Sequence, residues 1–278
     1  MLPASRASAV ASRALLLLAF VLVAACGRPP APAFPTGAST PFPDFASAYA
    51  GASATCSKTT TLTVSIALSG KAGRTKLRGR VDAGFAAPSQ MRLEGRAPFG
   101  RPIFILTSSR DRAVLVLPRD DRVLTGATAA EIVEALAGVP LSPDALRTIV
   151  SGCGFSAGDT PTDGRAFAGG SAAVTTGNST TYLRRTGDAW QIIGATRDSL
   201  SVFYSGLQNG RPTVVNLRAG ANGTTADIVF RLSELEVNPS LDPQTFQQQV
   251  PAEATPLTID ELRRAGPLGD TGKSSSTT

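Results

Sequence analysis

Histidine is missing from the 278-residue sequence, and this absence removes most routes to catalysis. A Ser-His-Asp triad, a Cys-His pair and a histidine-ligated metal site all need the imidazole ring. One acidic pair, Asp120 and Asp121, is a candidate for hydrolytic chemistry, but Arg119 and Arg122 flank it as they would in a solvated turn. We therefore predict a protein without enzymatic activity, with no catalytic residues, no metal and no cofactor.

The sequence also lacks an apolar run long enough to span a membrane near its start. Residues 14–25 form an apolar run of about 12 residues after Arg6 and Arg13, whereas a membrane-spanning helix needs about 20. Residues 1–25 are therefore predicted to be a signal peptide. The run ends in Val-Ala-Ala-Cys at residues 23–26, which resembles the bacterial lipobox and implies lipidation of Cys26. The alternative is an ordinary signal peptide whose mature chain begins near a cysteine.

Lipidation at Cys26 has consequences for location. Two or more acyl chains give stable membrane anchoring without a spanning segment. The next residue is Gly27 rather than the aspartate that favours retention at the inner membrane. We therefore predict a lipid-anchored protein of the cell envelope, in the outer membrane and facing the periplasm. Residues 26–50, rich in proline and alanine, are predicted to be a tether.

Cysteine is scarce, and two cysteines remain after Cys26, namely Cys56 and Cys153. An even remainder in an oxidising compartment favours a disulfide between them. The alternative is a pair of buried free thiols.

The excess of positive charge is small. The formal charge is +6, and it falls to +4 when residues 1–25, which carry two arginines, are removed. The basic residues alternate with apolar ones and form no stripe with aromatic residues. The sequence therefore predicts no nucleic-acid partner.

Apolar residues recur with a period of two over most of the mature chain, which predicts strands with one buried face. About ten or eleven strands are expected, at residues 61–68, 77–85, 91–97, 103–106, 114–117, 122–125, 181–184, 189–193, 199–207, 214–217 and 227–237. Residues 154–171 are predicted to be a mobile surface loop, and residues 263–278 a disordered tail.

Between the strands the period becomes helical. Thr128 with Glu131 predicts a capping box, and Gly138 a helix end. Ser142 and Pro143 predict a second helix start. The two segments are expected to form a helical hairpin on the sheet.

Several segments resemble the lipoprotein-localisation superfamily, the LolA/LolB-like proteins. The resemblance covers residues 57–262 and rests on residues 92–100, the strand at 103–106, the Gly-Val-Pro-Leu-Ser-Pro stretch at 138–143 and Phe246 with Val250-Pro251. It implies an α+β, mostly β fold: an incomplete antiparallel β-barrel over residues 51–262, covered by a helical hairpin lid. It also implies an apolar cavity for acyl chains, with lipoproteins or lipids as cargo for transfer. Phe99 stands where the membrane-anchored member carries an exposed apolar residue, although the loop here is shorter.

If the sheet encloses a ligand cavity, its apolar face and the hairpin supply the lining. The predicted lining residues are Leu62, Val64, Ile66, Leu68, Val81, Phe85, Leu93, Ile132, Leu136, Leu146, Ile149, Trp190 and Ile192. The alternative is that these side chains are plain core. The protein would then be an envelope-assembly lipoprotein acting through protein contacts, with residues 154–171 and the C-terminal tail as contact regions.

Overall fold

The computed structural model describes residues 32–110, 112–155, 158–220, 225–266 and 268. Cys26 and the predicted signal peptide lie outside these residues. The chain divides into two units, Met1–Ala33 and Phe34–Thr278. The second unit contains the hydrophobic core of the described residues, so it has the core that independent folding needs.

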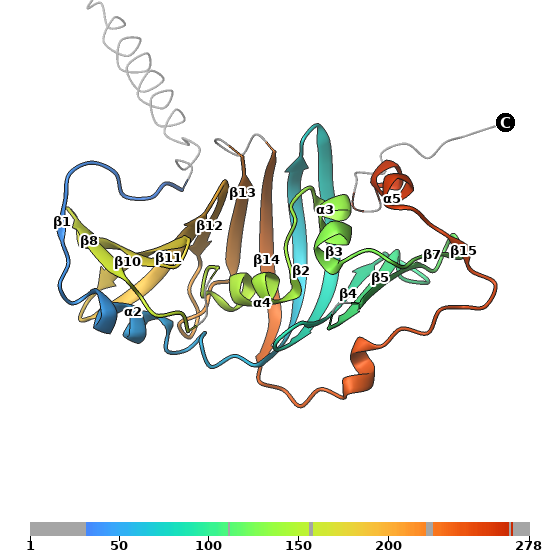
Figure 1. Ribbon diagram of the computed structural model, residues 1–278, viewed down its shortest axis with the longest axis horizontal. Coiled ribbons are helices and arrows are strands. Elements are labelled where there is room, and N and C mark those ends of the chain that lie inside the picture. Colours follow the sequence, from blue (N-terminus) through green and yellow to red (C-terminus); the bar gives the residue numbers. More distant parts are fainter. Residues whose placement is uncertain (1–31, 111, 156–157, 221–224, 267, 269–278) are drawn as a thin grey trace, which may run out of the picture. The chain divides into compact units, whose positions relative to one another are not determined.

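One open sheet of 15 strands runs through this second unit (Figure 1). The spatial order is β1-β8-β9-β10-β11-β12-β13-β14-β2-β3-β4-β5-β6-β7-β15, and β1 and β15 do not pair with each other. The strands are β1 Ser39–Pro41, β2 Thr61–Ala72, β3 Thr75–Ala86, β4 Gln90–Arg96, β5 Phe104–Ser109, β6 Arg112–Leu117, β7 Arg122–Leu124, β8 Asp163–Phe167, β9 Ser171–Thr176, β10 Ser179–Thr186, β11 Ala189–Arg197, β12 Leu200–Ser205, β13 Val214–Ala219, β14 Ala226–Val237 and β15 Thr255–Pro256. All neighbours are antiparallel except β15 and β7. The predicted incomplete β-barrel is thus confirmed.

The sheet has more strands than the sequence predicts. The additional strands are β1, β8, β9 and β15, which are short and rich in small residues or proline. The prediction of a surface loop over residues 154–171 was therefore wrong from Asp163 onward. Gly164 in β8 shows why. A side chain at this position would collide with Phe45 of α2, so only glycine fits. Glycine has a low strand propensity, and the sequence therefore gives little sign of the strand.

Four α-helices and one short 3₁₀ helix accompany the sheet in the described residues. They are α2 Phe45–Ser53, α3 Ala129–Ala137, α4 Pro143–Ser151, η2 Pro243–Phe246 and α5 Ile259–Ala265. The helical hairpin α3–α4 has the predicted capping: Thr128 and Glu131 form a capping box, and the Ser142 side chain accepts from the Ala145 N–H. Gly138 and Gly152 end the two helices in the left-handed conformation, at φ 76° and 95°.

The packed body begins earlier than the predicted tether boundary at residue 50. Phe34 stacks between Tyr182 and Phe203, with ring centroids 4.0 and 4.2 Å away. Strand β1 pairs with β8, and α2 buries Tyr49 against the sheet. The interval from Phe34 to residue 50 is therefore part of the folded unit, because its aromatic side chains Phe34 and Tyr49 pack against the sheet.

The C-terminal boundary also differs from the prediction. Helix α5 continues to Ala265, and Leu268 is buried, with 4% of its surface exposed. The predicted disordered tail is therefore wrong for residues 263–266 and 268. Residues 269–278 lie outside the described part of the chain.

Candidate functional site

An apolar cavity lies between the sheet and the lid, by which we mean helices α3 and α4 with their connection. Seventeen residues surround it, and all of them are apolar. They are Ile66, Leu68, Val81, Phe85, Leu93, Phe104, Val133, Leu136, Ala137, Val139, Leu141, Leu146, Val150, Leu217, Ile228, Phe230 and Leu268. A site with this lining can attract hydrocarbon but has no group to hold a polar or charged ligand.

The cavity is small in this conformation. Its volume is about 60 Å³, whereas pockets that bind small molecules measure roughly 300–1,000 Å³. The side chains of the lid and the sheet fill most of the space beneath α3 and α4. An acyl chain therefore fits only if part of the cover moves.

The structure places the predicted lining residues in three groups. Seven of them line the cavity, namely Ile66, Leu68, Val81, Phe85, Leu93, Leu136 and Leu146. Leu62, Val64, Ile132 and Ile149 are buried in the surrounding core. Ile192 and Trp190 belong to β11, away from the cavity, so the prediction was wrong for these two. Trp190 contacts Phe42, with ring centroids 5.3 Å apart.

Sequence reasoning missed the lining contributed by β5, β13, β14, the connection between the helices and the C-terminus, and three residues of the helices themselves, Val133, Ala137 and Val150. Leu217 and Phe230 lie in strands that the sequence does predict. The alternation of apolar and polar residues along these strands is the signal that could have identified them as lining residues. Val139 and Leu141 sit in the Gly-Val-Pro-Leu-Ser-Pro connection, where apolar residues flank a proline. For Leu268, a single leucine in a polar tail, the sequence holds no signal.

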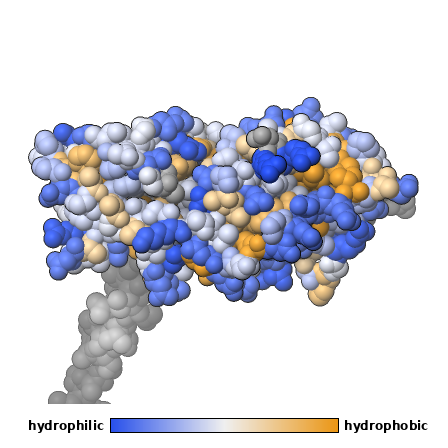
Figure 2. All heavy atoms as spheres, turned by 60° about the horizontal axis from the view of Figure 1, so that its bottom comes forward, coloured by the Kyte–Doolittle hydropathy of each residue, from blue (hydrophilic) through white to orange (hydrophobic). Residues whose placement is uncertain are grey.

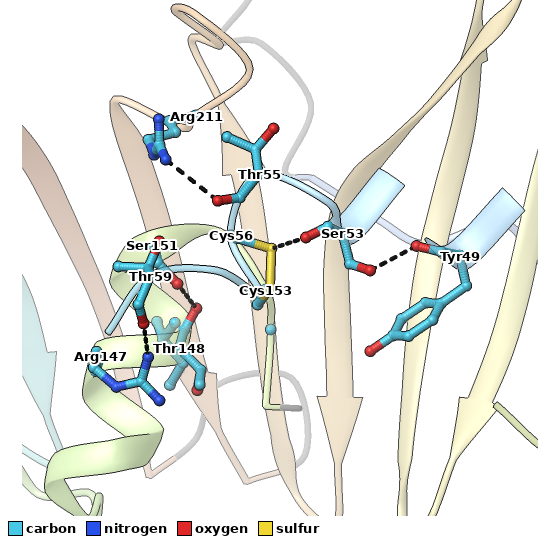
Figure 3. Close-up of a disulfide and its surroundings, with 12 residues drawn as sticks. Tyr49, Ser53, Thr55, Cys56, Thr59, Arg147, Thr148, Ser151, Cys153 and Arg211 are labelled. Carbon is cyan, nitrogen blue, oxygen red and sulfur yellow. Dashed lines mark hydrogen bonds between the residues drawn. A yellow bond between two sulfur atoms is a disulfide. The ribbon is translucent and has the colours of Figure 1, made fainter. Parts of the chain in front are cut away.

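Helix α4 is the fixed half of the lid. Eight of its nine residues are buried. Its Arg147 donates to the carbonyl oxygen of Thr59 and forms an ion pair with Asp144, so a buried guanidinium ties the helix to the segment before β2 (Figure 3). Breaking such a contact would leave a buried charge without its partners, which is costly.

A disulfide between Cys56 and Cys153 holds the C-terminal end of α4, which is the pairing that the cysteine count predicts (Figure 3). The two Cα atoms are 5.5 Å apart and the cysteines are 97 positions apart in sequence. Cys153 is fully buried. The bridge therefore joins the segment after α2 to the end of the lid.

The hydroxyl of Tyr204 secures the same end from the sheet. It donates to the carbonyl oxygen of Ile149 at 2.9 Å and accepts from the N–H of Gly154 at 2.9 Å. Burial raises the pKa of this phenol well above its usual value, so it stays protonated and able to donate. Together with the disulfide, Tyr204 makes the end of α4 a fixed point.

Helix α3 is held more lightly. It buries Ala129, Ile132, Val133 and Leu136 on one face. Glu131 forms its capping box with Thr128, and these hydrogen bonds lower the pKa of Glu131. Helix α3 packs mainly on α5 and β6, and no disulfide in the described chain reaches it. Besides this packing, the positive charge of Arg263 on α5 acts on Glu131.

The loop between β4 and β5 presents Phe99, which has 89% of its surface exposed. Its backbone is braced, because the guanidinium of Arg119 donates to the carbonyl oxygens of Phe99 and Arg101 at 3.1 and 3.2 Å. An exposed aromatic ring beside arginines is suited to contact with a lipid surface.

The acidic pair Asp120 and Asp121 lies in the exposed turn between β6 and β7, where Asp121 is 3.7 Å from Arg101.

Within the described residues, no group of three or more Cys, Asp or Glu side chains is arranged to hold a metal ion. None of the helices in the described part of the chain combines the length and the apolarity that crossing a bilayer requires.

Much of the face shown in Figure 2 is hydrophilic. Hydrophobic areas, in orange, are most extensive toward the right, the side on which Figure 1 places β4, β5 and β7.

A groove of about 760 Å³, larger than the apolar cavity, lies at β4–β6. It is lined by Pro88, Ser89, Gln90, Thr107, Ser109, Arg110, Arg112, Val114, Pro243, Phe246, Gln247 and Gln248. Because side chains alternate along a strand, Thr107 and Ser109 point away from the face on which Leu106 joins the core.

No protein-family model matches the chain, and no curated protein matches it in sequence. Among solved structures, the chain is similar to a LolA superfamily protein from Nitrosomonas europaea, at 11% identity over 73% of this chain and 96% of that one, with a TM-score of 0.45. It is similar to a DUF1329 family protein from Desulfovibrio piger, at 12% identity over 73% and 97%, with a TM-score of 0.45. A third is LprF from Mycobacterium bovis, at 12% identity over 75% and 100%, with a TM-score of 0.35.

Proposed function

We propose that this protein is a lipid-anchored envelope protein that binds acyl chains, of lipids or of lipoproteins, between its sheet and its lid for transfer within the envelope. The observation that carries the proposal is the lining of the cavity, in which all seventeen residues are apolar. Binding would be hydrophobic transfer, to which each buried methylene contributes about 0.8 kcal/mol.

Opening would occur at α3. Arg147, Tyr204 and the Cys153 bridge fix α4, whereas α3 is held by apolar packing. Lifting α3 exposes Ile132, Val133 and Leu136, at a cost of at most roughly 5–9 kcal/mol for three large apolar side chains. The entering acyl chain must offset that cost, which requires on the order of six to eleven methylene groups. Long acyl chains should therefore bind and short ones should not.

Lipidation at Cys26 would place this site at a membrane, and the sequence around Gly27 favours the outer membrane, facing the periplasm. Phe99, 89% exposed on its braced loop, would then touch the lipid surface during transfer. The protein acts without catalysis in this account.

The proposal is tested by a displacement assay on the chain from residue 27, exported without lipidation. The fluorescent probe is dansylated undecanoic acid, and the competitors are fatty acids of graded length. We expect displacement to begin between about six and eleven methylene groups. Ala137→Trp fills the cavity from α3 and should abolish probe binding, whereas Ala50→Trp, on the exposed face of α2, should leave it unchanged. Equal binding by both variants would refute the assignment of the site.

A second candidate function is an envelope-assembly lipoprotein with a packed core that acts through protein contacts. The small volume of the cavity, about 60 Å³, favours it, and the groove of about 760 Å³ at β4–β6 offers a contact surface. Residues 154–171 and the C-terminal tail stay predicted contact regions, and the structure places β8 in the first and the end of α5 in the second. Absence of probe binding at every chain length would favour this candidate.

A further inference from the structure

The chain covers its own cavity with a segment near its C-terminus. This segment, the C-terminal strap, comprises residues 255–266 and 268 and contains β15, α5 and Leu268. It touches the edge of the sheet, the movable helix of the lid and the cavity itself. Each contact is made by a different part of the strap.

The first part of the strap is attached to the sheet edge. The N–H groups of Thr255 and Leu257 donate to the carbonyl oxygens of Asp121 and Val123, at 2.9 and 2.6 Å. Arg122 of β7 donates to the carbonyl oxygen of Pro256 at 2.8 Å. These bonds add β15 to the sheet as a parallel edge strand of two residues, so the attachment is short.

The second part, α5, packs on α3, the half of the lid that we propose to move. Leu262 is fully buried in this helix. The carboxylate of Glu261 accepts from Thr258 in a capping box and pairs with Arg122 at 2.9 Å, which ties α5 to β7. Lifting α3 away from the sheet while α5 stays in place would break the contacts between the two helices.

The third part, Leu268, fills part of the cavity. Its carbonyl oxygen accepts from the N–H of Arg78 at 3.0 Å, and its side chain is one of the cavity's walls. A glycine on β3 makes room for it: a Cβ at Gly79 would lie 3.2 Å from Cδ2 of Leu268. The leucine side chain thus occupies, beside β3, space that hydrocarbon of a ligand would take.

We propose that the C-terminal strap is an autoinhibitory latch: Leu268 competes with an acyl chain for the cavity, and α5 holds α3 closed. The proposal rests on the proposed function, because it names the regulation of the same site. Its physical basis is that α5 packs on the helix that we propose to move, while Leu268 lines the cavity. Release of the strap frees the space beside Gly79 and removes the contacts of α5 with α3 in one step.

The test compares the chain from residue 27 with its Leu268→Ser variant. Leu207→Ser is the matched control, since Leu207 is an exposed leucine that does not line the cavity. Two quantities are measured: the affinity for dansylated undecanoic acid and the hydrogen exchange of the amides of α3. We expect Leu268→Ser to bind the probe about tenfold more tightly or better, because burial of a leucine shifts an equilibrium by at least that factor. Amides of α3 should exchange faster, and Leu207→Ser should match the unmodified chain.

The outcomes separate the latch from the site. Equal probe affinity and equal α3 exchange in the chain and in Leu268→Ser would overturn the latch, while probe binding by both would leave the proposed function standing. Faster α3 exchange without any probe binding would show that the strap restrains α3, but it would overturn both acyl binding and the competition by Leu268. Glu261→Gln loosens the strap from outside the cavity, so it gives the same test if Leu268→Ser does not fold: unchanged α3 exchange in that variant would overturn the latch.

Discussion

Replacing Cys56 and Cys153 together with alanine should lower the stability of the protein strongly. The bridge joins positions 97 apart in sequence. In the chain-entropy model a loop of that length contributes about 4.7 kcal/mol by restricting the unfolded chain. With a urea m-value of about 3 kcal/mol per molar, the midpoint of unfolding should fall by about 1.5 M.

The assay is equilibrium unfolding in urea followed by the fluorescence of Trp190, the single tryptophan. The unmodified chain under reducing conditions should unfold at nearly the same midpoint as the double-alanine variant, which makes reduction an internal control. A midpoint within about 0.3 M of the oxidised chain would refute the reasoning, because the end of α4 would then not depend on the bridge. Beyond stability, loss of the bridge should free α4 and change the rate at which a bound acyl probe is released.

Three further predictions concern the other ends of the fold. Phe34→Ala removes two ring stacks and should cost about 1–3 kcal/mol in urea unfolding; an unchanged midpoint would show that the segment before β1 is not docked. The hydrogen bonds from Thr258 and Arg122 lower the pKa of Glu261 to about 2, below the roughly 4.3 of an unfolded glutamate. The stabilisation by the Glu261 carboxylate is therefore complete above about pH 4.3 and lost as the pH falls to 2. The difference in unfolding free energy between the unmodified chain and Glu261→Gln should vanish over that interval, and a pH-independent difference would contradict the prediction. Phe99→Ser should weaken binding of the non-lipidated chain to lipid vesicles about tenfold without changing acyl-probe binding in solution, and equal vesicle binding would exclude Phe99 as a membrane contact.

The lid is the part of the fold that the sequence predicts best, because its signals are local. Thr128 and Glu131 satisfy backbone N–H groups at the start of α3, and Gly138 supplies the left-handed residue that ends it. Ser142 does the same for α4. These interactions involve residues three or four positions apart, so they can be recognised without knowing the rest of the structure.

The parts that the sequence does not predict depend on contacts between distant segments. Strand β8 needs Gly164 because Phe45 packs on it. The alternation around Trp190 predicts a strand but does not say which region of a 15-stranded sheet its side chain reaches. Leu268 is a lone leucine whose role depends on the space beside Gly79, some 190 positions away. Periodicity contains no information on such pairs.

Native mass spectrometry of the chain from residue 27, exported without lipidation and purified without detergent, tests most directly whether the lid opens to admit hydrocarbon. We predict a species carrying an acyl lipid for the unmodified chain, a larger fraction of it for Leu268→Ser and none for Ala137→Trp. Masses without any bound lipid for both the unmodified chain and Leu268→Ser would contradict it, and would leave a solid core under α3 and α4.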